Sequence, residues 1–309
     1  MSQSFLARLP LSRFEVDRDY LTRERENLFD ELWLDSATRV LPIFQGTALL
    51  SSPTALALLP VGAIPDATLL VYLGRSTSTT SPEPVGTPIV AALLEDAGHL
   101  AESDWANLRA VGSQLSDRDA GLLTEALGVI NWHASHGFSP RTGEPTIVGK
   151  GGWVRRDPVS NTEVFPRTDA AIIVGVTDAD DRLLLGSNAL WESNRYSLLA
   201  GFVEPGESLE AAVIREVFEE SGLRVVNPVY LGSQPWPFPA SLMLGFTAQL
   251  DPDVLNTAVP DGAEILDLRW FTREELAASL DEILLPGPTS IARAIIDEWY
   301  GGPIDDGQR

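Results

Sequence analysis

The chain has 309 residues, of which 44% are hydrophobic, and its 44 acidic residues against 22 Lys and Arg give a net charge of −22. This acidic excess argues against general affinity for nucleic acid or an anionic membrane, so an anionic substrate has to meet metal ions or local basic residues. The complete lack of cysteine excludes disulfides and thiolate metal sites. No stretch of about 18 apolar residues and no signal-peptide core is present, so we expect a cytoplasmic protein without a membrane partner.

The first part of the chain, residues 1–134, predicts a smaller mixed α/β domain. Short strand-like runs alternate with polar turns and are followed by two helical stretches, 103–115 and 117–134. Residues 76–88 are rich in Ser, Thr and Pro and predict a long hairpin loop. No catalytic constellation stands out here, which favours a scaffold or dimerisation role. The expected strands cover residues 39–44, 55–59, 68–73 and 89–94.

A Gly-, Pro- and Arg-rich connector, residues 135–167, precedes a C-terminal domain over residues 168–309. This domain interleaves strands and helices, which predicts a mixed sheet between helices, an α/β fold. Its length, added to that of the first domain, is enough for two separate cores. The expected strands cover residues 170–176, 183–185, 228–232, 242–249 and 267–271, and a final helix covers residues 289–299.

The most informative segment is residues 201–223, which read GFVEPGESLEAAVIREVFEESGL. We expect a helix over residues 209–221, with Ser208 as the N-cap and Gly222 ending it. At 100° per residue, four apolar residues form one arc that should face the core. The segment fits the spacing G-x5-E-x7-R-E-x2-E-E-x-G, which arises by chance in about one window in 10⁸. The apolar arc comprises Val213, Ile214, Val217 and Phe218.

Three carboxylates, Glu216, Glu219 and Glu220, lie within about 100° of one another on this helix. Each like-charged pair costs roughly 0.2–0.5 kcal/mol, so stability alone does not favour the arrangement. A divalent cation such as Mg²⁺ or Mn²⁺ relieves the repulsion, because it takes hard oxygen ligands. The alternative is a solvated acidic face. Arg215 can pair with Glu219 one turn on and with Glu207, which would make the loop–helix–loop rigid.

The seven matched positions are those of the Nudix box, and the chain resembles a Nudix hydrolase. The resemblance implies an α/β/α sandwich that uses water and divalent metal to split a nucleoside diphosphate joined to another group. The matched positions are Gly201, Glu207, Arg215, Glu216, Glu219, Glu220 and Gly222.

A second motif, SQPWPFPAS, covers residues 233–241. Its alternating prolines remove amide donors and fix φ, so it cannot be a helix or a central strand. We expect a stiff extended loop that presents Trp236 and Phe238 to a flat heterocycle such as adenine or nicotinamide. A packed surface turn is the alternative. The candidate substrate-binding residues of this motif are Gln234, Pro235, Trp236, Pro237, Phe238, Pro239, Ala240 and Ser241.

This motif, some ten residues after the box, resembles the signature of the NADH pyrophosphatase subfamily. The subfamily cleaves NADH, and NAD⁺ less efficiently, to a nicotinamide mononucleotide and AMP, and some members remove the NAD cap from RNA. Its connector normally carries a four-cysteine zinc ribbon, for which this chain has other residues, so we expect no zinc. His133 and His136 are interpreted as helix-end and packing residues rather than metal ligands. The residues where the four cysteines would fall are Ser139, Thr142, Asp157 and Ser160.

The resemblance also implies roles for individual residues. Glu216, Glu219, Glu220 and Glu264, with the backbone carbonyl of Ala200, are the implied ligands of two or three Mg²⁺ or Mn²⁺ ions. Glu219 is the candidate general base or water-positioning group, beside Glu216, Glu220 and Arg215 as further catalytic residues. Phe202, Phe165 and Ala292 match substrate contacts. In relatives the residue at Phe165 comes from the partner subunit, which implies a homodimer.

Other functions stay open at this point. Nudix boxes also serve hydrolases of ADP-ribose, diadenosine polyphosphates and nucleoside triphosphates, and some Nudix domains are ligand sensors without turnover. An RNA 5′ end is a further candidate partner, because a run of basic residues interrupts the acidic chain. A solvated loop or a dimer contact is the alternative for that run. It comprises Arg141, Lys150, Arg155, Arg156 and Arg167.

Overall fold

The computed structural model describes residues 5–192, 194–253 and 257–307, which form two compact units. The C-terminal unit contains the described residues up to Pro10, then Asp169–Pro235, and the described residues from Ser241 onward. The N-terminal unit contains Leu11–Thr168 and the short segment Trp236–Ala240. The connector therefore belongs to the N-terminal unit, whereas residues 5–10 pack with the C-terminal unit.

The C-terminal unit is built on a six-stranded sheet with the order β15-β16-β12-β13-β17, in which β14 also pairs with β12. β12 and β16 run parallel, whereas β13 and β14 pair antiparallel with β12. The predicted mixed sheet is thus confirmed. The strands are β12 (Asp169–Thr177), β13 (Leu183–Asn188), β14 (Leu199–Phe202), β15 (Val225–Trp236), β16 (Ser241–Leu250) and β17 (Ile265–Phe271).

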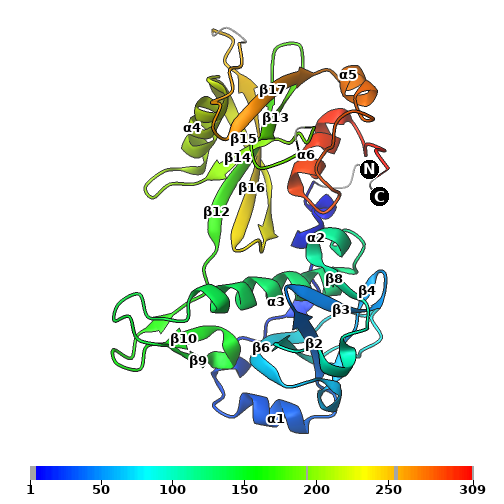
Figure 1. Ribbon diagram of the computed structural model, residues 1–309, viewed down its shortest axis with the longest axis vertical. Coiled ribbons are helices and arrows are strands. Elements are labelled where there is room, and N and C mark those ends of the chain that lie inside the picture. Colours follow the sequence, from blue (N-terminus) through cyan, green and yellow to red (C-terminus); the bar gives the residue numbers. More distant parts are fainter. Residues whose placement is uncertain (1–4, 193, 254–256, 308–309) are drawn as a thin grey trace. The chain divides into compact units, whose positions relative to one another are not determined.

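Helices cover both faces of this sheet (Figure 1). Side chains alternate along β12, so Ile172 and Val174 join the core under α4 (Leu209–Ser221). Ile173 joins the opposite core, under α6 (Ile291–Tyr300). The predicted α/β/α sandwich is confirmed. The second core also takes in residues of η1 (Phe5–Arg8) and of α5 (Arg273–Ala278), neither of which the sequence pattern predicted.

The proline motif begins as a strand and not as a loop, which corrects one expectation. β15 continues through Gln234 and Pro235 to Trp236, and only the residues after it form the turn before β16. β15 is an edge strand of the sheet. An edge strand tolerates proline because its outer side has no ladder to complete.

The N-terminal unit contains an eight-stranded sheet with the order β1-β6-β7-β2-β3-β4, to which β5 and β8 add on β2 and β3. α3 (Asp117–Ser135) supplies much of its core, including Trp132. The predicted strands over 39–44, 68–73 and 89–94 and the hairpin loop at 76–88 are confirmed, whereas the strand expected over 55–59 is divided into two short strands that pair with different neighbours. The strands are β1 (Val16–Asp17), β2 (Arg39–Phe44), β3 (Thr47–Ser52), β4 (Ala55–Leu56), β5 (Leu59–Pro60), β6 (Ala67–Ser76), β7 (Pro88–Leu94) and β8 (Trp105–Asn107).

The helix expected over 103–115 is wrong in its first half. Residues Trp105–Asn107 form β8, which pairs with β3. α2 (Leu108–Val111) begins only after Asn107, whose side chain accepts a hydrogen bond from the Ala110 amide at 2.9 Å. Pairing with a distant strand therefore overrides the local helical pattern. The remaining helices are α1 (Leu28–Leu34), η2 (Pro10–Ser12), η3 (Thr22–Glu24), η4 (Val61–Ala63), η5 (Gly98–Leu100) and η6 (Lys150–Gly152).

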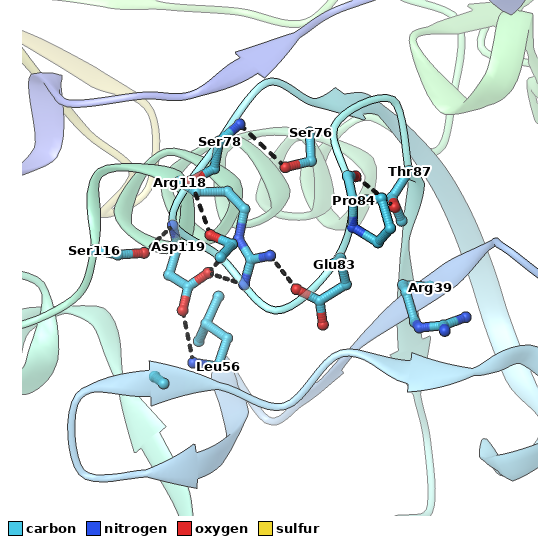
Figure 2. A network of polar contacts seen from close by, with 12 residues as sticks. Arg39, Leu56, Ser76, Ser78, Glu83, Pro84, Thr87, Ser116, Arg118 and Asp119 are labelled. Carbon is cyan, nitrogen blue, oxygen red and sulfur yellow. Dashed lines mark hydrogen bonds and ion pairs between the residues drawn. The ribbon is translucent and has the colours of Figure 1, made fainter.

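A buried ion-pair network ties the 76–88 loop to α3 (Figure 2). The Arg118 guanidinium donates to Glu83 of the loop and, at 2.8 Å, to the neighbouring Asp119. Asp119 also accepts from the Leu56 amide at 2.9 Å. Arg118 and Asp119 are almost fully buried. The network therefore joins three segments that are far apart in sequence.

The connector folds around a buried carboxylate. β9 (Ile147–Gly149), β10 (Val154–Arg156) and β11 (Glu163–Val164) form a small sheet, and Asp157 follows β10. The fully buried Asp157 carboxylate accepts from the hydroxyls of Ser139 and Thr142, each at 2.8 Å, and of Ser160 at 2.7 Å. Burial opposes ionisation, but these hydrogen bonds outweigh it and hold the Asp157 pKa well below its ordinary value. The four positions do converge, and the acid occupies their centre.

His133 is a packing residue, as expected. Arg155 donates to its Nδ1 at 2.9 Å, so the proton lies on Nε2, which donates to the Gly152 carbonyl at 2.7 Å. His136 caps the end of α3, where its ring contacts the Trp132 carbonyl.

Candidate active site

The box forms the predicted loop–helix–loop on one side of the C-terminal sheet. Ser208 caps α4 by accepting a hydrogen bond from the Ala211 amide at 3.1 Å. Gly222 ends the helix with φ at 69°, a left-handed conformation that glycine adopts without strain. Both predicted ends of the helix are confirmed.

The core face of α4 differs from the predicted arc. Val213 and Val217 are buried, but Ile214 is 42% exposed and Phe218 51% exposed. Glu220 and Ser221 are buried in their place. The helix is therefore rotated so that a carboxylate, and not the rest of the apolar arc, lies against the sheet.

Arg215 organises the acidic residues of the box. Its guanidinium makes two hydrogen bonds to Glu207, at 2.8 and 2.9 Å, and one each to Glu216 at 2.8 Å and Glu219 at 2.9 Å. It also donates to the Phe202 carbonyl at 2.9 Å. Hydrogen bonds from Arg215 lower the Glu207 pKa to about 2. The predicted pairing is confirmed, and one cation fixes both the loop and the helix.

Glu220 is a buried carboxylate on the acidic face of α4 that is only partly compensated. It is buried, and its Oε2 atom has no hydrogen-bond partner. Burial, followed by the charges of Glu264, Glu216 and Asp261, raises the Glu220 pKa to about 8. An unpartnered buried carboxylate oxygen among other acids is costly to the fold. A divalent cation would offset that cost, so the residues present fit such an ion.

Gly201 lets Glu216 approach the sheet. Gly201 lies in β14, and a Cβ atom added there would overlap the Glu216 carboxylate. Burial raises the pKa of Glu216, although Arg215 acts in the opposite direction. The preceding residue, Ala200, is the one whose carbonyl was predicted to bind metal, and its backbone amide donates a hydrogen bond to Glu220. β14 thus brings Ala200 beside the acidic face of α4.

Glu264 approaches this face from the start of β17. Its amide donates to Asp261, as does the Ile265 amide at 2.7 Å, so Asp261 shapes the turn that carries Glu264. Asn188 donates to the Glu264 carboxylate at 3.3 Å. In the part of the chain that the structure describes, no group of three or more Asp, Glu or His side chains is arranged so that it could hold a metal ion by itself. Mg²⁺ does not need one, since it keeps several waters and takes one or two carboxylates together with substrate phosphates.

The predicted substrate residues fall into several environments. Phe202 and Phe165 are exposed, at 61% and 59%. Gln234 is fully buried and donates to the Thr289 carbonyl at 3.0 Å, so its amide stabilises the C-terminal unit. The predicted contact of this side chain with substrate is therefore wrong. The Ala292 amide donates to the cap residue Ser290 at 3.1 Å. A contact from the Ala292 amide to substrate would compete with that cap.

Sequence reasoning missed three residues around the two motifs. Asp261 lies three residues before Glu264, and this spacing could have predicted a turn in which the Asp261 side chain accepts from the Glu264 amide. Arg109 and Asn131 contact the segment Trp236–Ala240 within the N-terminal unit. Nothing local marks them, because the contact joins residues more than a hundred positions apart.

A mixed sheet between helices, with an arginine-pinned acidic helix beside one strand, is the fold and site of a Nudix hydrolase. The family model of the NUDIX domain matches residues 166–289. A second family model, the NADH pyrophosphatase-like rudimentary NUDIX domain, matches residues 37–132.

Whole-chain comparisons place the protein more finely. It is 42% identical over 278 residues to the NAD-capped RNA hydrolase NudC of Mycobacterium bovis (strain BCG / Pasteur 1173P2), with 87% of this chain and 85% of the relative covered. It is 37% identical to the human NAD-capped RNA hydrolase NUDT12, over 60% of this chain and 43% of that protein. A solved NUDIX hydrolase from Nitrosomonas europaea aligns with a TM-score of 0.43 and 22% identity, over 54% of this chain and 94% of that one. The chain belongs to the NADH pyrophosphatase subfamily of the Nudix hydrolases. Over the described residues, the structure has no helix both long and apolar enough to cross a bilayer.

Proposed function

We propose that this protein hydrolyses the pyrophosphate bond of NADH and NAD⁺, giving a nicotinamide mononucleotide and AMP, and acts likewise on the NAD cap of RNA. The observation that carries the proposal is Glu220, a buried carboxylate with an unpartnered oxygen beside Glu216 and Glu264. An intact acidic face of this kind supports an enzyme over a ligand sensor. Clustered carboxylates destabilise the fold, and a sensor without turnover would not need them. The names of the two relatives, both NAD-capped RNA hydrolases, support the substrate.

Glu216, Glu220 and Glu264, with the Ala200 carbonyl, would hold two or three Mg²⁺ or Mn²⁺ ions. When bound, these ions neutralise charge on the pyrophosphate and lower the pKa of the attacking water. Glu219 is 57% exposed at its side chain and tethered to Arg215. It would orient the water and accept its proton as the oxygen attacks phosphorus and the bridging P–O bond breaks.

Other residues of the site hold the carboxylates and the substrate in place and do not take part in proton transfer. Arg215 keeps the loop and helix in one geometry through its five hydrogen bonds, so the carboxylates need no rearrangement at the moment of reaction. Phe202 offers a ring face to one base of a dinucleotide. We also propose a homodimer in the cytoplasm, with Phe165 reaching the partner's substrate.

Two cations of the basic run in the connector are engaged within the protein, which leaves fewer of them to bind RNA phosphates than the sequence suggested. Lys150 lies between Glu24, at 3.3 Å, and Glu163, at 3.2 Å. Arg155 donates to Thr146 and His133. These two cations stabilise the connector. For capped RNA we therefore expect recognition of the NAD moiety to dominate, with only weak salt dependence.

The test is a product analysis. Purified protein is incubated with NADH and Mn²⁺ or Mg²⁺, with a chelator control, and the nucleotides are separated by chromatography. Metal-dependent release of AMP and reduced nicotinamide mononucleotide in equal amounts is the expected result. A panel of ADP-ribose, diadenosine tetraphosphate and NAD-capped RNA run in parallel identifies the preferred substrate. Folded protein that cleaves only ADP-ribose or the diadenosine compound would overturn the proposal.

A further inference from the structure

Among the described residues that follow Thr168, the segment Trp236–Ala240 belongs to the N-terminal unit. Its neighbours Pro235 and Ser241 both belong to the C-terminal sheet. Trp236 and Phe238 pack against the core of the N-terminal unit. The two rings meet edge to face, with centroids 4.9 Å apart and planes at 66°.

Arg109, in the first turn of α2, lies over both rings. Its guanidinium carbon is 4.0 Å from the centroid of Phe238 and 4.9 Å from that of Trp236. A guanidinium in this position is attracted by the ring quadrupoles and holds the two rings at a fixed angle. Arg109 is an exposed residue, but its guanidinium contacts two aromatic rings at once.

Asn131, on α3, holds the backbone of the same segment. Its side-chain amide donates to the Pro237 carbonyl at 2.9 Å and to the Pro239 carbonyl at 3.3 Å. Both residues are prolines without an N–H group, so their carbonyls are the main-chain groups by which the turn can be held. Arg109 thus fixes the rings, whereas Asn131 fixes the backbone between them.

We propose that Arg109 and Asn131 are positioning residues for dinucleotide recognition: the N-terminal unit holds the Trp236–Phe238 pair as a rigid platform for a substrate base. This inference rests on the proposed function for the identity of the substrate. It gives the N-terminal unit a definite role, for which the sequence indicated only a scaffold. A platform fixed before binding has little conformational entropy to lose when a base stacks on it, so it acts on affinity and not on bond cleavage.

The first test follows the segment itself, without any substrate. Because the chain has no cysteine, Ala240→Cys introduces a unique thiol whose labelling rate by a maleimide reports release of the segment. In that background, Arg109→Ala and Asn131→Ala are each expected to label about three to ten times faster. Arg25→Ala, which removes an exposed arginine paired with Glu31 in the same unit, is the matched control and should label at the parental rate. Unchanged labelling in both test variants would overturn the inference, whatever the substrate is.

The second test measures steady-state hydrolysis of NADH by the same substitutions without the introduced thiol. Arg109→Ala is expected to raise KM about tenfold while kcat changes less than about twofold, and Arg109→Lys should fall between, because an ammonium lacks the flat guanidinium face. Faster labelling with KM unchanged would show that the platform does not serve substrate and would also overturn the inference. If the wild-type protein does not cleave NADH, the proposed function fails by itself, and the labelling result still decides whether Arg109 and Asn131 hold the segment.

Discussion

Each unit of the molecule contains an arginine followed directly by an acid on a helix. The two pairs differ in whether the buried polar atoms around them all have hydrogen-bond partners. In the N-terminal unit, Arg118 and Asp119 are buried, and none of their side-chain polar atoms is left without a partner (Figure 2). In the C-terminal unit, Arg215 and Glu216 are similarly paired, but the nearby Glu220 keeps an unpartnered buried oxygen. A completed network stabilises a fold, whereas an incomplete acidic one is a cost that a metal-dependent reaction explains.

The largest effect expected from this comparison is on turnover. Glu220→Gln should lower kcat for NADH by roughly a thousandfold, because it removes a charge that the ions need. The same substitution should leave the melting temperature unchanged or slightly higher, since it relieves repulsion with Glu216 and Glu264. Thermal unfolding and steady-state kinetics on one preparation check both parts. A folded variant with wild-type turnover would show that the incomplete network is not the active site.

Breaking the complete network should affect stability alone. Arg118→Met leaves two carboxylates in and near the core without their cation, which costs about 3–5 kcal/mol in the free energy of unfolding. Urea unfolding measures this loss, and kcat per folded molecule should stay at the wild-type level. Arg25→Ala, at an exposed pair, should cost less than about 1 kcal/mol. Equal losses in the two variants would contradict the assignment of the Arg118 network as structural.

Glu125 is a second buried carboxylate of the N-terminal unit, and it should make the stability of the protein depend on pH. Burial raises the Glu125 pKa to about 7, although Arg18 and Arg23, 3.6 and 3.8 Å away, oppose the shift. From the ordinary value of 4.5 up to about 7, the folded state holds this proton more tightly than the unfolded state, so stability falls as pH rises through that window. The loss amounts to roughly 3 kcal/mol. Glu125→Gln should flatten the curve between those limits in urea unfolding at several pH values, and a curve of unchanged slope would count against it.

The smallest effect is expected in the connector. Asp157→Asn replaces the central acceptor of three hydroxyl donors with an amide that accepts less strongly, so the turn around Ser139 should open more often. Trypsin cleavage after Arg141 in that turn measures the opening, and it should become faster while kcat stays the same. Added zinc should change neither variant nor wild type. Protection of the wild-type connector by zinc would contradict a carboxylate-centred connector.

Local chemistry along the chain was enough to predict much of the catalytic unit. The spacing of glycine, arginine and glutamates in residues 201–223 predicts the helix, both of its ends and the pairing of Arg215, because caps and one-turn ion pairs depend on near neighbours. The mixed sheet follows from the alternation of strands and helices. The resemblance to the subfamily's connector located Ser139, Thr142 and Ser160, whose hydroxyls all donate to Asp157.

Only the tertiary structure decided which faces are buried and what holds the second motif. The rotation of α4 that exposes Ile214 and buries Glu220 depends on β14. The periodicity of the helix sequence contains no information about the strand that packs against it. β8 replaced half of a predicted helix because it pairs with β3. Arg109 and Asn131 meet the segment Trp236–Ala240 across more than a hundred residues of chain. Contacts of this kind depend on how the whole chain packs, so no window of sequence contains them.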